Sequence, residues 1–291
     1  MTRRKSQRGV TLIEMMIAMV VSLVLIAGVG TIYISSKRNY QARDQFSMMD
    51  ENARIALNSL KKHLEHAGYA ANGVFPLPHP FVVGGQPAWA PCGKISLNRK
   101  TSSQIYLTQD GAVPAPPVNV QNDGVGIAFL SDDSLFTDCG NSSFDVDTDA
   151  CRASQAPSSM GALVYNSFSI DWVAGSREQN SVQDFIPTLY CSGSASGSKQ
   201  MIAQGIERME LMYGVDSDAD GSVEQYLTAN NVGANWPSVI SIKVGLLVKS
   251  LEPVLQGAES RTYDVLGNTV TTNDRYQRSV YTEVIHLRNR V

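Results

Sequence analysis

The pattern of apolar and polar residues divides the first 67 residues into two helical halves. Residues 15–34 form an uncharged run, mostly of Met, Ile, Val, Leu and Ala, that is long enough to span a bilayer as a helix. Between Tyr40 and Ala67 there is neither Pro nor Gly, and apolar residues recur at steps of three and four, as in an amphipathic helix. This apolar face consists of Phe46, Met49, Ala53, Leu57, Leu60 and Leu64. The sequence predicts one helix from Val10 to Ala67, of roughly 85 Å, with Gly68 as its C-cap.

Beyond Gly68, apolar residues recur with the period of two that is typical of strands. Six segments predict strands: SQIYLTQ, VGIAFLS, ALVYNSFSIDWV, IERMELMYGV, VISIKVGLLVK and SVYTEVIHLRN. In VISIKVGLLVK, every second residue from Ile240 to Val248 is apolar, which predicts a strand with one buried face. Residues 69–100 and 110–124 are rich in Pro and Gly and are predicted to be loops.

A long helix packed against an antiparallel β-sheet is an α+β fold, here a head on a membrane stalk. We expect four parts: a leader peptide at 1–9, the transmembrane half of the helix at 10–34, its amphipathic half at 35–68, and a β-rich head at 69–291. The chain of 291 residues is long enough to bury a sizeable core.

The charge distribution sets the N-terminus apart from the rest of the chain. Residues 1–9 hold four basic residues and no acid, which leaves 20 Lys and Arg against 27 Asp and Glu, a net charge of −7, in the remainder. This balance argues against nucleic-acid binding. A basic leader before an apolar span predicts a cytoplasmic N-terminus, with the head on the periplasmic side of the inner membrane. No A-x-A pattern follows the apolar run, so an ordinary secretory signal is not predicted.

The four cysteines all follow the apolar run, and their spacing favours disulfides in an oxidising compartment. They form no CxxC pair and have no nearby His, which argues against a zinc site. Cys139 and Cys151 flank a short loop and are the preferred pair, leaving Cys92 with Cys191. Four cysteines allow three connectivities, and buried free thiols are the alternative.

The stretch RGVTLIE, followed by an uncharged helix, resembles the class III signal of type IV pilins and type II secretion pseudopilins. The resemblance implies that a prepilin peptidase cuts after Gly9 and methylates the new N-terminus at Val10. Two further stretches, DENARIALNSLKKHLEHAGYAANG and IERMELMYGVDSDADGSVEQYL, are similar to minor pilins of the PilW family, as is the ending EVIHLRNR. Val10 departs from the usual Phe or Met, which bears on methylation more than on cleavage.

Glu14 stands at the head of the apolar run, and two interpretations account for it. A charged side chain at the centre of a bilayer helix costs about 2.5 to 3.5 kcal/mol on insertion scales and usually has a partner. The resemblance implies that Glu14 pairs with the N-terminal amine of a neighbouring subunit and sets the helix register in a pilus. Position alone also permits a solvated residue in the headgroup region. We prefer the assembly role because the Gly9–Val10 junction precedes Glu14.

The resemblance also implies a function and a set of partners. A PilW-type minor pilin helps to initiate type IV pilus assembly near the fibre tip, and therefore contacts other minor pilins, the major pilin and a large PilY-type tip adhesin. In the resembled superfamily, the subunit at the extreme tip tends to lack the Glu that corresponds to Glu14. The presence of Glu14 therefore implies a place just below the tip. A pseudopilin of a type II secretion system is the alternative.

No catalytic motif supports an enzyme. The sequence contains no GxSxG, HExxH or P-loop, and Ala195 stands where the serine of a nucleophile elbow would be. His63 and His66 are three residues apart beside Lys61, Lys62 and Glu65, which favours a solvated polar face over a metal site. A membrane-anchored periplasmic enzyme or binding domain is a further alternative, but no group of residues specifies its chemistry.

The segment DSDADGSVE, which starts at Asp216, resembles the first half of a calcium-binding EF-hand loop. The candidate ligands are Asp216, Asp218, Asp220, the backbone carbonyl of Ser222, and Glu224. Position 12 of the loop is Leu227 in place of the bidentate Glu, and the flanking residues predict strands where an EF-hand has helices. The alternative is a hairpin turn whose acids face water. No other cofactor is expected.

Overall fold

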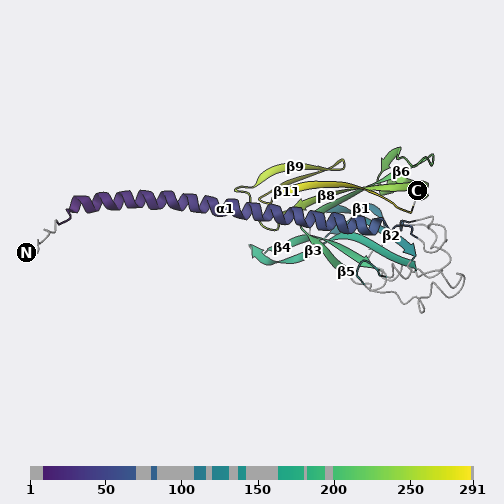
Figure 1. The fold of residues 1–291 in the computed structure, drawn as a ribbon, viewed down its shortest axis with the longest axis horizontal. Coiled ribbons are helices and arrows are strands. Elements are labelled where there is room, and N and C mark those ends of the chain that lie inside the picture. The colour runs from purple at the N-terminus through teal and green to yellow at the C-terminus, as the bar shows by residue number, and fades with distance from the viewer. Residues whose placement is uncertain are drawn as a thin grey trace, which may run out of the picture.

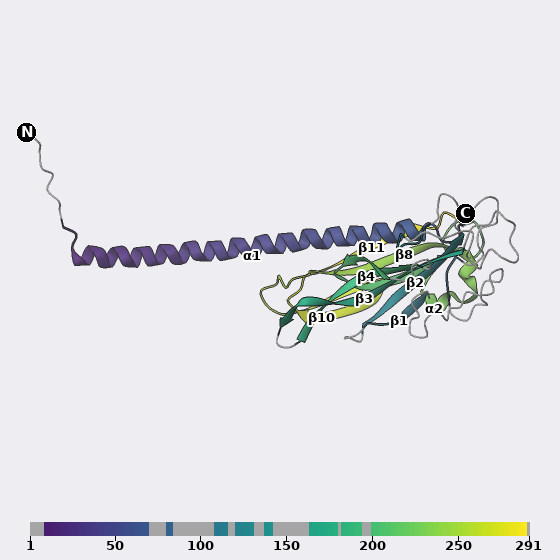
Figure 2. The same cartoon turned by 90° about the horizontal axis from the view of Figure 1, so that it is seen from below.

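The computed structural model describes residues 9–69, 80–83, 108–115, 120–130, 137–141, 163–179, 182–193 and 199–289. A single long helix, α1 (Leu12–Leu64), dominates the shape: its first half stands clear of the strands and its second half lies along them (Figures 1 and 2). The helix starts two residues later and ends three residues earlier than predicted. Gly68, which follows the last turn at φ 74°, donates its N–H to the Ala128 carbonyl and leads the chain away.

The described part of the head contains two antiparallel sheets and a separate hairpin, which confirms the predicted α+β class. The first sheet has the order β1 (Gln109–Ala115), β2 (Val120–Leu130), β3 (Leu163–Gln179), β4 (Val182–Gly193), β5 (Lys199–Gln204). The second has the order β11 (Arg278–His286), β8 (Val239–Lys249), β6 (Ile206–Val215), β7 (Gln225–Leu227). The hairpin is β9 (Glu259–Val265) with β10 (Asn268–Asp274), and a short helix α2 (Ala229–Val232) and the 3-10 turn η2 (Gly233–Ser238) precede β8.

Gly205 joins the two sheets. Its N–H donates to the Pro187 carbonyl of β4, and its carbonyl accepts from the Lys249 N–H of β8, each at 2.7 Å. The chain thus passes from the edge of one sheet into the middle of the other at a single residue. Gly205 has φ 79°, and a Cβ there would lie 2.6 Å from the Lys249 carbonyl oxygen. Only glycine suits this position, because it tolerates positive φ and the close backbone approach.

The second half of α1 lies over the junction of the two sheets, in contact with β5, β8 and β11 (Figure 1). Its buried stripe is Gln45, Met49, Ala53, Ala56, Leu60 and Leu64. Fully burying a Leu such as Leu60 stabilises the fold by about 2 kcal/mol. The predicted apolar face began with the wrong residue. Phe46, which was predicted to be buried, is 43% exposed, whereas the preceding residue Gln45 is buried. Gln45 is held there because its Oε1 accepts the N–H groups of Leu251 and Glu252, each at 3.0 Å.

The strand β8 has the predicted bounds, but it is buried on both faces rather than on one. Leu247, on the face predicted to be polar, is 0% exposed. The turn of the β9–β10 hairpin covers this face: a Cβ on Gly245 would lie 2.8 Å from Leu266. Alternation within a strand shows which residues share a face, but it does not show what covers each face.

The prediction of a loop at 110–124 was wrong, because most of this segment forms β1 and the start of β2. Pro114 pairs with Gln121 in this ladder. A proline is tolerated there since β1 is the edge strand of its sheet and one side of it needs no ladder donor. The predicted strands at 206–215 and 239–249 match β6 and β8, whereas β4, β5, β7, β9 and β10 were not predicted. Most of SQIYLTQ lies outside the described residues.

Candidate functional site

The predicted cleavage junction lies immediately before α1. Gly9 and Val10 are exposed and belong to no helix or strand, and the side chain of Val10 is 71% exposed. Apart from Gly9 and its chain neighbours, no atom of the described residues lies within 4 Å of the position that a Cβ on Gly9 would take. The junction is therefore accessible, and nothing in the described chain itself requires glycine at this position.

Glu14 closes a capping box with Thr11, which is the N-cap of α1. Its Oε2 accepts from the backbone N–H of Thr11 at 2.9 Å and from the Thr11 hydroxyl at 3.0 Å. The Thr11 Oγ1 in turn accepts the Glu14 N–H at 3.4 Å. All these bonds to the carboxylate use one oxygen, Oε2. Thr11 was not predicted as a functional residue, although the T-x-x-E spacing is the signature of a capping box.

The residues between Val10 and Ile34 place large apolar side chains on every side of the helix, exposed in this single chain. Within the described residues, α1 is the helix that is long and apolar enough to cross a membrane. Lipid or the apolar helices of other subunits would cover these side chains, because no part of the described head reaches them.

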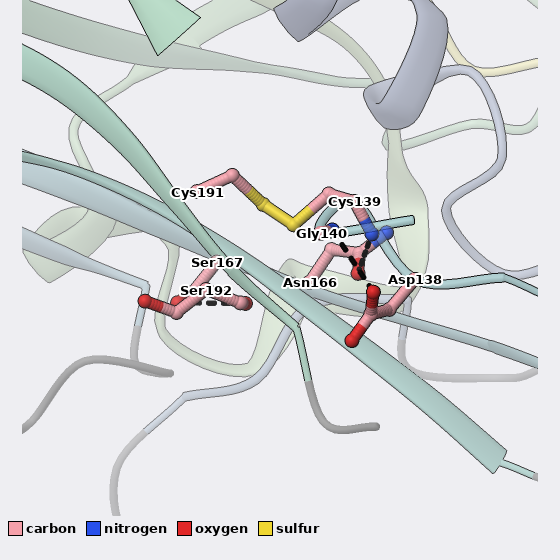
Figure 3. The surroundings of a disulfide bond; sticks show 7 residues. All are labelled: Asp138, Cys139, Gly140, Asn166, Ser167, Cys191 and Ser192. Carbon is pink, nitrogen blue, oxygen red and sulfur yellow. Dashed lines mark hydrogen bonds between the residues drawn. A yellow bond between two sulfur atoms is a disulfide. The ribbon is translucent and has the colours of Figure 1, made fainter. Parts of the chain in front are cut away.

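A disulfide joins Cys139 to Cys191, with the two Cα atoms 6.2 Å apart (Figure 3). The predicted pairs, Cys139 with Cys151 and Cys92 with Cys191, were therefore wrong. Cys92 and Cys151 themselves lie outside the described residues.

The three-dimensional neighbourhood of Cys139 explains its pairing. The Cys139 N–H donates to Asn166 Oδ1 at 3.0 Å, which places the segment 137–141 against β3. Cys191 lies on the adjacent strand β4, directly opposite Phe168 in the ladder. Gly193 has no side chain and so leaves room for Asp138, because a Cβ there would overlap the Asp138 carboxylate. Cys139 and Cys191 are 52 residues apart in sequence, so their distance along the chain did not indicate the pairing.

The acidic segment 216–224 forms the loop between β6 and β7. One oxygen from each of Asp216, Asp218, Asp220 and Glu224 lies within 4.8 Å of the others. Backbone N–H groups already donate to these carboxylates: Ala219 and Gly221 donate to Asp216 at 2.6 and 2.9 Å, and Ser217 donates to Glu224 at 2.6 Å. Such bonds stabilise a turn without a cation. Calcium binding with Ser222 as a further ligand therefore stays a prediction.

If this loop binds calcium, 10 mM calcium should raise the melting temperature of the protein in detergent. At a Kd of about 10⁻³ M the stabilisation is about 1.4 kcal/mol. The double variant Asp218→Ala, Asp220→Ala should lose this gain, and magnesium at the same concentration is the control for ionic strength. A melting curve that is the same with and without calcium would contradict calcium binding and leave the hairpin turn as the interpretation of this segment.

His63 and His66 were expected on a solvated face, which is only partly correct. The ring centroid of His63 lies 5.6 Å from that of Phe168, and His66 lies 6.2 Å from Phe129. Burial, and then the positive charge of Lys62, lower the pKa of His63 to about 4. At neutral pH His63 is therefore uncharged and packs as part of the helix–sheet interface.

Two family models match the chain. Residues 4–30 match the prokaryotic N-terminal methylation motif, which covers the Gly9–Val10 junction and Glu14. Residues 173–289 match the type IV pilus-assembly protein W, which runs from within β3 to beyond β11. The chain therefore resembles type IV pilins at its N-terminus and the PilW family over much of its head. No curated protein matches it.

Among solved structures, a type IV-like pilin from Thermus thermophilus aligns with this chain at 12% sequence identity. The alignment covers 83% of this chain and 96% of the other, with a TM-score of 0.38. The methylation motif implies processing by a prepilin peptidase and assembly with other pilins, and together with the apolar half of α1 it indicates a membrane-anchored pilin. The family matched over 173–289 is described as a pilus-assembly protein.

Proposed function

We propose that this chain is a minor pilin that is cut between Gly9 and Val10, methylated at Val10, and inserted near the tip of a type IV pilus to help initiate assembly. The observation that carries the proposal is the PilW domain at 173–289 on the same chain as the methylation motif at 4–30. A type II secretion pseudopilin would share the N-terminal motif, whereas the PilW domain favours a pilus.

In this proposal the chain first resides in the inner membrane, with its N-terminus in the cytoplasm and its head in the periplasm. The basic leader and the apolar span support that orientation. The partners are the prepilin peptidase, other minor pilins, the major pilin and a PilY-type tip adhesin. The exposed apolar half of α1 supplies the surface that neighbouring helices cover in the fibre.

The capping box supports a role for Glu14 with two partners. Its Oε2 accepts both bonds from Thr11, and the carboxylate keeps Oε1 for a second donor. In the fibre, that donor is the amine of Val10 on a neighbouring subunit. An ammonium–carboxylate hydrogen bond contributes about 1.5 to 3 kcal/mol, and more where water is excluded. We therefore assign helix capping to Oε2 and subunit register to Oε1.

Three variants separate the two roles of Glu14. Glu14→Gln keeps a side chain that can cap the helix but removes the charge, Glu14→Ala removes both, and Thr11→Ala keeps the charge but removes the hydroxyl of the box. We expect recovery in sheared pili to fall roughly tenfold or more for both Glu14 variants, because 1.4 kcal/mol is a factor of ten. Thr11→Ala should assemble nearly as well as the unaltered protein.

Membrane insertion should be at least as efficient in Glu14→Ala, since a desolvation cost disappears. Mature N-termini are sequenced first, so that a processing defect is not mistaken for an assembly defect. Normal recovery of Glu14→Gln in sheared pili would contradict the charge-pairing role, and loss of assembly in Thr11→Ala alone would assign Glu14 to capping only.

A further inference from the structure

Three carboxylates from three strands meet where β1 and β2 of the first sheet lie against β6 of the second sheet. Asp110 lies on β1, Asp123 on β2 and Glu210 on β6, and one oxygen of each lies within 4.8 Å of the other two. Asp123 and Glu210 are each only 3% exposed. This cluster is separate from the N-terminal assembly site and from the acidic loop at 216–224. Its three residues belong to no sequence motif described above.

Among the strands that the structure describes, none pairs with the stretch of the β6 edge at which the cluster lies. The strand β7 pairs with β6 only between Tyr213 and Val215. Further along the same edge, two backbone amides of β6 donate to side chains of β2 instead: Met209 to Asn122 Oδ1 at 3.2 Å, and Leu211 to Asp123 Oδ2 at 2.7 Å. The other oxygen of Asp123 accepts the Gly111 N–H of β1 at 2.8 Å. One carboxyl group thus ties together β1, β2 and β6.

The charges around this carboxyl group do not balance if all three acids are ionised. Glu210 pairs with Arg208 and accepts from Asn268 of β10 at 2.5 Å. Within the described residues, no other ion pair reaches the three acids. From α2 the cluster receives only a neutral amide, that of Asn230, at 3.5 Å from Asp110. The charged groups of the described residues at this site are therefore three acids and one guanidinium, that of Arg208.

Tyr213 of β6 is a further titratable group near the cluster. It is fully buried, and its hydroxyl has no hydrogen-bond partner in the described part of the chain. Burial, and then the charges of Asp123 and Asp110, raise its pKa well above the ordinary value, so it does not supply a charge. The same two causes act on Asp123: burial, followed by the charge of Glu210, raises its pKa from 3.8 to about 7.

We propose that Asp123 and Glu210 share one proton, and that this proton fastens β1 and β2 to the open edge of β6. A divalent cation fits the site less well, because both Asp123 oxygens accept backbone N–H groups and Glu210 is held by Arg208 and Asn268. The closed junction binds the proton, whereas the opened junction exposes Asp123 to water, where its pKa is ordinary. Acid therefore closes the junction, and rising pH opens it, so that the joint between the two sheets is a pH-sensitive element of the head.

The direction of the pH effect follows from linkage. Between pH 3.8 and about 7 the closed junction holds one more proton than the open one, so opening becomes about tenfold easier for each pH unit. His63 has the opposite effect on global unfolding, since its pKa is lowered and stability falls as pH decreases from 6.5 toward 4. A local measurement at β6 is needed because these two contributions oppose one another in the global stability.

The test is amide hydrogen exchange of the full chain in detergent micelles between pH 5 and 8, with intrinsic exchange rates removed. The protection factors of the Met209 and Leu211 amides should fall about tenfold per pH unit from pH 5 to 7 and level off above. Asp123→Asn should abolish this slope. Glu210→Gln removes the neighbouring charge while keeping Asp123 and its hydrogen bonds, so it should reduce the slope even if Asp123→Asn fails to fold. Glu51→Gln, at an exposed position of α1 with no role assigned to it, is the matched control and should keep the wild-type profile.

Two results would overturn the proposal. The first is a Leu211 protection factor in the unaltered protein that does not change with pH or that rises with it. The second is a large gain in protection at 5 mM calcium that appears in the unaltered protein and is lost in Asp123→Asn, since the cluster would then hold a cation in place of a proton.

Discussion

Replacing Gly9 with Val is expected to leave the protein entirely as uncleaved precursor. We expect this effect to arise in the peptidase. A larger side chain at Gly9 would disturb no contact among the described residues of this chain, because the space around Gly9 is empty there. An enzyme that cuts at the membrane face must admit the residue before the scissile bond, and Val adds a branched side chain there. The precursor retains nine residues and is about 1 kDa heavier than the mature form.

The matched control for this experiment is Val10→Phe, which restores the residue usual after the cleaved glycine and leaves Gly9 intact. It should be cut normally. Immunoblots of membranes, followed by mass spectrometry of the N-terminus, distinguish the precursor from the mature form. A mature protein that starts at residue 10 in the Gly9→Val variant would show that Gly9 is not the determinant.

Removing the disulfide should produce the second largest effect, on stability. The bond between Cys139 and Cys191 closes a loop with a sequence separation of 52. For a loop of this size the chain-entropy model gives about 4 kcal/mol of stabilisation. The double variant Cys139→Ser, Cys191→Ser should therefore melt roughly 8 to 16 °C lower, at about 2 to 4 °C for each kcal/mol in a domain of this size.

The double variant is preferable to a single one because a lone Cys191 thiol could pair with another cysteine. Peptide mapping of the unaltered, unreduced protein should recover the peptides of Cys139 and Cys191 linked to each other. Reduction of the unaltered protein should lower its melting temperature by a similar amount. Alkylation of Cys139 or Cys191 in the native, unreduced protein would contradict the pairing.

Features that depend on neighbouring residues in the chain were predictable from the sequence. The helix α1 follows from a local period of 3.6 residues and the absence of Pro and Gly over its second half, and β6 and β8 follow from the period of two in their apolar residues. The cleavage junction and Glu14 are part of a short linear motif, so reading them required no tertiary contact. The capping box of Thr11 with Glu14 is equally local, because its T-x-x-E signature spans only four residues.

The tertiary structure alone decided which distant residues meet. Cys139 pairs with Cys191 because Asn166 places one segment against β3 while β4 brings the other alongside it. Leu247 is buried because the β9–β10 hairpin folds over a strand face that alternation predicts to be polar.

The acidic cluster is the clearest case of this kind. Asp110, Asp123 and Glu210 belong to no sequence motif, and their carboxylates come together only when β2 lies along the open edge of β6. Periodicity reports which residues share a face, since it arises from backbone geometry that repeats every few residues. The identity of the surface that covers a face depends on contacts across the whole chain, and the sequence pattern of a single segment does not contain it.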